Sequence, residues 1–349
     1  MSGPPPSPEP SPDSPPAAPV EALLIVSFGG PEGPDDVMPF LENCVPGKNV
    51  PPARLQEVAR HYEPFGGVSP INAENRALLA ALVGYLNAHG PHLSVYWGNR
   101  NWHPLLADAV GQMAEDGIRS ALAFVTSAFG CYPGCRQYLE DIQRARADVG
   151  PEAPQIHKLR LFYNHPGFIE TVSDRARDAL DEVPPQQRDA SRLVFSAHSI
   201  PLRMAKSSPY ERQLREACRL VADRLGRSEW ELVYQSRSGP PGEPWLEPDI
   251  RDALGRLASQ GVRDVVLVPI GFLCEHMEIV YDLDIEAAAV CGGLGLNLVR
   301  AEVAGTHPRL VRMIRELVVE QLDPSAPRLA LGSQGPWPDR CPDDCCPSA

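Results

Sequence analysis

Eight short apolar runs recur along the chain, and stretches with helical periodicity separate them. The runs are residues 22–27, 93–97, 121–126, 158–162, 193–196, 232–235, 265–270 and 296–301. Short buried strands that alternate with helices are typical of parallel βαβ units. The pattern predicts an α/β protein with two four-stranded parallel sheets, each flanked by helices.

An internal repeat supports this division into two. Residues 104–119 align without gaps to residues 248–263, and seven of the sixteen positions are identical. Each copy predicts a helix with proline in its first turn, a glycine stop and a following strand. Two common helix–strand units could match by coincidence, but the gapless register favours duplication. We therefore expect two similar Rossmann-like halves with a cleft between them.

Composition changes mark the ends of the two halves. Residues 1–19 contain proline at nine positions and predict a disordered tail that carries no chemistry. The N-terminal half then covers residues 20–165, and the C-terminal half, with the candidate metal site, covers residues 166–322. Residues 323–349 form a Pro-, Ser- and Gly-rich linker and a cysteine-containing tail.

Charge and hydropathy exclude several classes of protein. The 349 residues carry a formal net charge of -13 and have a pI near 5.2, which argues against a nucleic-acid partner. The chain has no apolar stretch long enough to cross a bilayer and no signal-peptide pattern at its start, so we expect a cytoplasmic protein. Six of its nine cysteines are scattered, which is not the pattern of a disulfide framework.

Polar side chains follow two of the predicted strands. His198, between Ser196 and Ser199, comes at the end of the run 193–196, and Glu278 follows the run 265–270. Open α/β sheets bind ligands at the carboxyl ends of their strands. A histidine at a strand end is often only hydrogen-bonded, but a facing carboxylate would raise its proton affinity and help to hold a divalent cation. The two residues predict a metal-handling or proton-abstracting pair.

The sequence around Glu278 is rich in acids. If residues 275–290 are helical, Glu275, Glu278, Asp282 and Glu286 lie on one stripe, where like charges repel. The stripe is either a solvated acidic face or a set of cation ligands. The apolar strand just before it favours a position at the crevice.

A third candidate site is the cysteine tail. Cys341, Cys345 and Cys346 supply three thiols, and a fourth from the body of the protein would complete an all-thiolate set. Cys135 is the candidate for the fourth, with Cys131 its nearest competitor. The set fits an iron–sulfur cluster or a zinc ion, and the remaining alternative is a disordered tail with reduced thiols.

Several segments dispersed over residues 20–322 resemble segments of the ferrochelatases of haem synthesis, and they occur in the same order along the chain. The details most resemble the coproporphyrin III ferrochelatases of actinobacteria, particularly at 27–32, 135–138 and 162–166. The matching segments are 27–32 (Ser-Phe-Gly-Gly-Pro-Glu), 65–71 (Phe-Gly-Gly-Val-Ser-Pro-Ile), 96–100 (Tyr-Trp-Gly-Asn-Arg), 135–138 (Cys-Arg-Gln-Tyr), 162–166 (Phe-Tyr-Asn-His-Pro), 196–201 (Ser-Ala-His-Ser-Ile-Pro), 234–239 (Tyr-Gln-Ser-Arg-Ser-Gly) and 275–282 (Glu-His-Met-Glu-Ile-Val-Tyr-Asp).

The resemblance implies a chelatase-type fold and roles for several residues. His198 and Glu278 would bind the ferrous ion and help to remove the pyrrole protons, and Asp282 and Glu286 would form an ion path. Ser69, Tyr138 and Phe28 would lie on the porphyrin-binding surface. Aromatic residues such as Phe28, Phe65 and Trp102 would suit a flat apolar ring, although each taken singly could equally belong to the core.

The resemblance also implies a cofactor, a substrate and partners. Relatives with this tail carry a [2Fe-2S] cluster, here expected on Cys135, Cys341, Cys345 and Cys346. The expected activity is insertion of ferrous iron into coproporphyrin III. Protoporphyrin IX is the alternative substrate, and a non-catalytic tetrapyrrole or metal carrier and an iron–sulfur redox protein are the competing functions. We expect a monomer that makes at most transient contact with neighbouring enzymes of the haem pathway.

Overall fold

The structure of the protein is a computed structural model that describes residues 19–45, 47, 50–239, 242–342 and 344–348. The predicted disordered segment 1–19 therefore lies, apart from Pro19, outside the described residues. Within the described ranges, no helix is long and apolar enough to cross a membrane.

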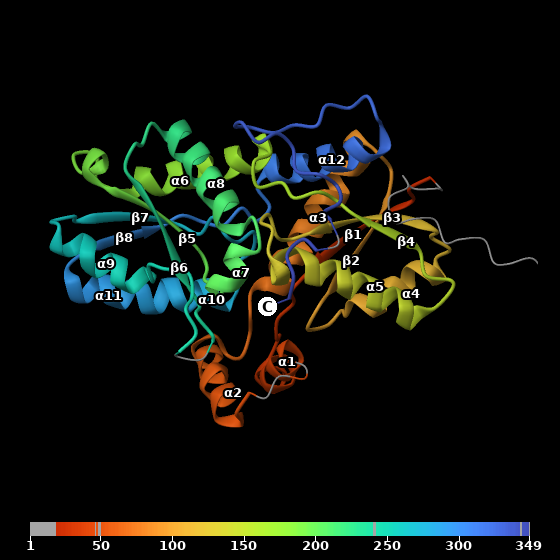
Figure 1. The fold of residues 1–349 in the computed structure, drawn as a ribbon, viewed down its shortest axis with the longest axis horizontal. Coiled ribbons are helices and arrows are strands. Elements are labelled where there is room, and N and C mark those ends of the chain that lie inside the picture. The colour runs from red at the N-terminus through yellow and green to blue at the C-terminus, as the bar shows by residue number, and fades with distance from the viewer. Residues whose placement is uncertain (1–18, 46, 48–49, 240–241, 343, 349) are drawn as a thin grey trace, which may run out of the picture.

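Two four-stranded parallel sheets form the framework, as the sequence predicts (Figure 1). The first has the strand order β2-β1-β3-β4 and the second has the order β6-β5-β7-β8, so their topologies are identical. The central strands β1 and β7 are fully buried apolar runs. The strands are β1 Ala22–Ser27, β2 Ser94–Asn99, β3 Ser120–Val125, β4 Gln155–Lys158, β5 Arg192–His198, β6 Trp230–Gln235, β7 Asp264–Val268 and β8 Asn297–Arg300.

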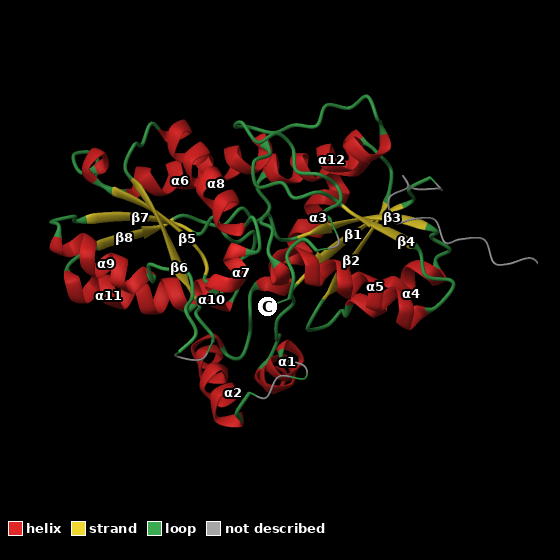
Figure 2. Ribbon diagram, in the orientation of Figure 1, coloured by secondary structure: helices red, strands yellow, loops and turns green. Residues whose placement is uncertain are grey.

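Helices cover both faces of each sheet (Figure 2). The α-helices are α1 Val37–Cys44, α2 Pro52–Ala59, α3 Ile71–His89, α4 Leu106–Glu115, α5 Gln137–Val149, α6 Pro166–Glu182, α7 Leu202–Lys206, α8 Tyr210–Leu225, α9 Ile250–Ser259, α10 Met277–Val280, α11 Ala288–Leu294 and α12 Pro308–Leu322. Two π-helices, η3 Tyr132–Arg136 and η5 Asp282–Ala287, precede α5 and α11. The 3-10 helices are η1 Pro34–Asp36, η2 Arg60–Phe65 and η4 Arg188–Ala190.

One predicted strand is wrong. The apolar run 158–162 meets β4 only at Lys158, because β4 occupies the more polar segment Gln155–Lys158 that pairs with β3. Leu159, Leu161 and Phe162 are buried, but they belong to a segment that crosses between the two halves. Its apolar character comes from burial at the junction rather than from the sheet.

The internal repeat occupies equivalent places in the two halves. In the first copy α4 leads into β3, and in the second α9 leads into β7, the strand at the matching position of its sheet. The prolines that open the two copies lie just before their helices rather than in the first turn: Asp249 caps α9 with its side chain, and the residue before it is Pro248. Identical placement in identical sheets supports duplication.

A second correspondence joins the halves. His165-Pro166 and His307-Pro308 each lie seven residues beyond the end of a strand, β4 at Lys158 and β8 at Arg300, and each pair opens a helix. In both cases the histidine Nδ1 accepts a backbone N–H from the second residue after it. Helix α6 follows the first sheet but packs on β7 and α8 of the second, whereas α12 follows the second sheet and packs on α3 of the first. The two halves thus exchange a helix.

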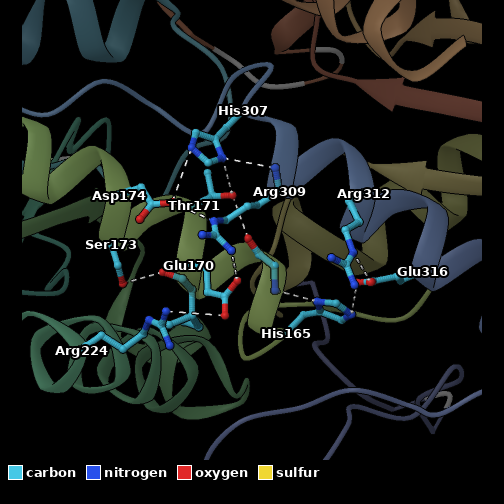
Figure 3. Close-up of polar contacts among 12 residues, drawn as sticks. His165, Glu170, Thr171, Ser173, Asp174, Arg224, His307, Arg309, Arg312 and Glu316 are labelled. Carbon is cyan, nitrogen blue, oxygen red and sulfur yellow. Dashed lines mark hydrogen bonds and ion pairs between the residues drawn. The ribbon is translucent and has the colours of Figure 1, made fainter. Parts of the chain in front are cut away.

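The exchanged helices are joined by a polar network (Figure 3). Arg309 of α12 donates to Glu170 and to Asp174 of α6, at 2.6 and 2.8 Å. His307 lies 3.7 Å from Asp174, and its ring also faces the Thr171 hydroxyl. Helix α6 begins at Pro166, and α12 lies over the first sheet. The division of the chain at residue 166 stays a prediction.

Candidate active site

His198 is the last residue of β5, where the strand reaches the carboxyl edge of the second sheet. Its Nδ1 contacts the backbone oxygen of Ser199. Because a carbonyl oxygen only accepts, Nδ1 carries a hydrogen and Nε2 is the atom left for chemistry. The side chain is 30% exposed.

Glu278 faces that nitrogen from the first turn of α10. Its Oε1 lies 3.4 Å from Nε2 of His198, and its side chain is 41% exposed. The turn is held in two ways: the ring of His276 accepts the Glu278 backbone N–H at 3.2 Å, and the amide of Gln235 donates to the Glu278 carbonyl. Residues from the loop after β7 and the ends of β5 and β6 therefore meet at one edge, as the strand-end rule predicts.

The pair holds a proton. Burial alone lowers the pKa of His198, but the charge of Glu278 and the hydrogen bond to it outweigh burial and raise that pKa to about 9. Burial raises the pKa of Glu278, and the facing imidazolium more than compensates, lowering it to about 2. At neutral pH the pair is an imidazolium and a carboxylate, with one proton available between them.

The predicted stripe of four acids is wrong at its first member. Glu275 precedes α10, and its carboxylate pairs with Arg300 of β8 at 2.9 Å. Helix formation starts only at Met277, because the side chain of His276 caps it there. Glu278, Asp282 and Glu286 remain, and they lie on α10 and the π-helix η5.

Asp282 is the middle acid of this group. Burial raises the pKa of Asp282 to about 7, helped by the charges of Glu278 and Glu286 and opposed by the Ser236 hydroxyl that donates to it. In η5 the Glu286 N–H bonds to the Tyr281 carbonyl five residues back. This wider turn keeps residues four apart on one face, and π-helical turns are frequent at functional sites.

The residues expected beside a porphyrin differ in exposure. Phe28, which follows β1, is 39% exposed and packs edge-on against Phe40 at 6.2 Å. Ser69 and Tyr138 are only 4% and 5% exposed, and Tyr138 lies under the guanidinium of Arg100. Phe28 therefore offers an exposed surface, whereas Ser69 and Tyr138 are buried.

An aromatic cluster of the first half reaches the acidic helix of the second. Phe40 contacts Phe28, Tyr62 and Trp102, and Phe65 packs on the same cluster, which also includes Met277 of α10. His61 stacks on Tyr281, with 3.9 Å between ring centroids. The aromatic residues singled out in the sequence therefore gather beside the His198–Glu278 pair.

The cysteines of the tail return to the first half. Cys346 is buried, and the thiols of Cys345, Cys135 and Cys131 join burial in raising its pKa. The Sγ atoms of Cys345 and Cys346 are 3.5 Å apart. Two thiolates on one tetrahedral metal with bonds of about 2.3 Å lie about 3.8 Å apart, so this pair fits one metal ion.

No group of three or more His, Cys, Asp or Glu side chains is arranged as a ready metal site within the described ranges. The thiols would have to draw together around a metal.

A cavity of about 710 Å³ lies elsewhere, at the amino-terminal edge of the second sheet, where Arg188, Arg192 and Arg227 are among its lining residues.

Three residues of the site were missed by the sequence reasoning. His276, Gln235 and Ser236 all lie in the matching segments 234–239 and 275–282 but received no role. Their contacts orient Glu278 and Asp282 through backbone and hydroxyl groups. Ser236 has a positive φ of 62°, unusual for a residue other than glycine, and its backbone is strained where its hydroxyl meets Asp282. A strained turn leaves no distinctive pattern in a single sequence.

Comparison with known proteins identifies the family. The profile of the family described as Ferrochelatase matches residues 20–322. A ferrochelatase of Rhodopirellula baltica is 53% identical over 94% of this chain and 93% of its own. A coproporphyrin III ferrochelatase of Nocardia farcinica is 53% identical over 88% of this chain and 90% of its own.

A solved structure agrees on the fold alone. SirB from Bacillus subtilis with Fe3+ superimposes with a TM-score of 0.54 at 14% identity, covering 89% of this chain and 99% of that one. The likeness extends over both halves, which agrees with the two-sheet architecture. Since the family profile spans both sheets and relatives match at about half of all positions, this chain belongs to the ferrochelatases, the enzymes that insert a metal ion into a porphyrin.

Proposed function

We propose that this chain inserts ferrous iron into coproporphyrin III, with His198 and Glu278 as the residues that receive the ion. The observation that carries the proposal is the pair itself: Nε2 and Oε1 face each other at 3.4 Å, and both side chains are open to solvent. Imidazole nitrogen and carboxylate oxygen are common ligands of divalent transition metals. The substrate follows the name of the Nocardia relative, which is about half identical.

The charge state of the pair suits the reaction. Insertion requires that two pyrrole protons leave and that the ion arrive partly dehydrated. Metal ligands must be deprotonated, so ferrous iron displaces the proton from Nε2 of His198 as it binds. When the ion moves on into the macrocycle, the freed imidazole is again a base and can take up one pyrrole proton, with the Glu278 carboxylate stabilising the imidazolium; the other pyrrole proton passes to water.

The acids behind the pair support an ion path. Asp282 and Glu286 of η5 follow Glu278 of α10 at intervals of four residues, and Asp282 changes protonation near neutral pH. An acid that exchanges protons easily can bind a cation briefly and release it. The aromatic cluster around Phe28 includes Met277, next to Glu278, and would support the flat face of the macrocycle.

The substrate is tested by anaerobic incubation with ferrous iron and each porphyrin in turn. We expect the Soret band to shift with coproporphyrin III and to change little with protoporphyrin IX, because two extra carboxylates require polar contacts that vinyl groups cannot use. Faster conversion of protoporphyrin IX would contradict the proposed substrate. Tight binding of either porphyrin without conversion would indicate a carrier instead.

We also propose that Cys135, Cys341, Cys345 and Cys346 hold a [2Fe-2S] cluster. The support is the all-thiolate donor set, the approach of Cys346 to Cys135 and Cys131, and the contact between the Cys345 and Cys346 thiols. The cluster would supply a covalent link between the tail and the body, and no step of iron insertion is routed through it.

Purified protein is expected to absorb in the visible range and to contain acid-labile sulfide. Cys341→Ser should abolish both signals, because oxygen is a poor ligand for a cluster that requires thiolates. The matched control is Cys291→Ser, since Cys291 lies in α11 of the second half, outside the cysteine tail. A colourless protein that contains zinc would contradict the cluster.

A further inference from the structure

The linker before the cysteines is attached to the junction between the halves. The Leu331 N–H donates to the Asn164 carbonyl at 2.8 Å, and the Asn164 side-chain amide donates to the carbonyls of Leu331 and Gly335. Arg160 donates to the Leu329 carbonyl at 2.8 Å. Backbone and side chains of the crossing segment 160–164 thus bind the tail at several points.

The same linker touches the second half. Gly332 has a φ of 75°, and a Cβ there would come within 2.0 Å of a carboxylate oxygen of Glu216 on α8. Only glycine suits that backbone and that close approach. The linker therefore contacts α8 at Gly332. Further along the chain, Cys346 of the tail approaches the thiols of the first half.

Trp337 follows these attachments along the tail and precedes Cys341. Its ring packs edge-on against the fully buried ring of Tyr163, with 6.2 Å between centroids and an interplanar angle of 75°. Its indole Nε1 donates to Sγ of Cys341 at 3.3 Å, and this hydrogen bond opposes the effect of burial, which raises the pKa of that thiol. One side chain therefore contacts both the crossing segment and a candidate cluster ligand.

We infer that Trp337 is a positioning residue of the thiol site, which fixes the Cys341 sulfur through its N–H and ties it to the junction through its ring. The inference rests on the proposed [2Fe-2S] cluster. A hydrogen bond to a ligating sulfur stabilises the more negative, reduced form of a cluster. The N–H of Trp337 therefore raises the reduction potential, a role separate from the packing role of the ring.

Trp337→Phe separates these two roles, because phenylalanine keeps an aromatic ring against Tyr163 and removes the N–H. In the purified full chain we expect a cluster that still assembles, with a reduction potential shifted to more negative values in a spectroscopic redox titration. The matched control is Trp97→Phe, which removes an indole hydrogen bond of 2.9 Å to Asn99, a contact with no thiol in it. Its potential should equal that of the wild type.

Hydrogen exchange tests the tie to the junction. We expect the Leu331 amide, which bonds to Asn164, to exchange at least tenfold faster in Trp337→Ala and at the wild-type rate in Trp337→Phe. An unchanged potential in Trp337→Phe, with the cluster present in the wild type, would overturn the inference and leave the cluster standing. A wild type without a cluster would overturn the proposed cofactor and the role of the N–H together.

Discussion

Replacing His198 with alanine is expected to lower the rate of iron insertion by about 10²–10⁴-fold, the range that a positioned acid–base group contributes. The variant loses the nitrogen that faces Glu278 at 3.4 Å, and with it one ligand and one proton acceptor. The rate is measured from the Soret shift under anaerobic conditions. Porphyrin binding, measured separately by fluorescence quenching, should change little, because the aromatic cluster around Phe28 remains.

Glu278→Gln tests the other member of the pair without changing its size. The amide cannot stabilise the imidazolium, so a loss similar to that of His198→Ala is expected. If the two side chains act on one ion, the double variant should be hardly slower than either single variant, because residues that act as a unit are not additive. The control is His89→Ala, an exposed histidine that stacks on Tyr85. Retention of more than half the wild-type rate in His198→Ala would contradict the site.

The sheets could be predicted from the sequence because their signal is local. β1 is a continuous apolar run that the chain buries completely, and its observed bounds are the predicted ones. The prediction over 158–162 was wrong because Leu159 and Phe162 are buried by a junction between halves, which leaves the same apolar signal as a strand. An apolar run indicates that a segment is buried, but it does not show which kind of element that segment forms.

The site was predictable only in part, for a similar reason. His198 and Glu278 follow strands, so topology alone brings them to one edge. The prediction includes Glu275 because it begins the helix two residues too early, before the side-chain cap of His276. Helix boundaries depend on such caps, and a histidine cap is a weak signal in a single sequence. The exchange of α6 and α12 could not be predicted either, since the local sequence of a helix does not specify the sheet on which it packs.

A buried ion pair links the crossing segment to the exchanged helix α12, between Arg160 and Glu320. The guanidinium makes two bonds to the carboxylate, at 2.7 and 2.8 Å, and both side chains are 1% exposed. Further donations from Arg160 go to the carbonyls of Leu161 and Leu329. The pair therefore joins the crossing segment, the last helix and the tail.

Arg160→Met is expected to lower the free energy of unfolding by about 3–5 kcal/mol, because it removes both hydrogen bonds to the buried Glu320 carboxylate and leaves it only the longer contact to Arg328, at 3.9 Å. The double variant Arg160→Met/Glu320→Leu should recover most of the loss, since neither charge then remains to be desolvated. The matched control is Arg119→Met, which breaks an exposed pair with Glu152 and should cost about 0–1 kcal/mol. Urea denaturation measures all three. A single variant as stable as the control would show that α12 is held by packing on α3 and α6 rather than by this pair.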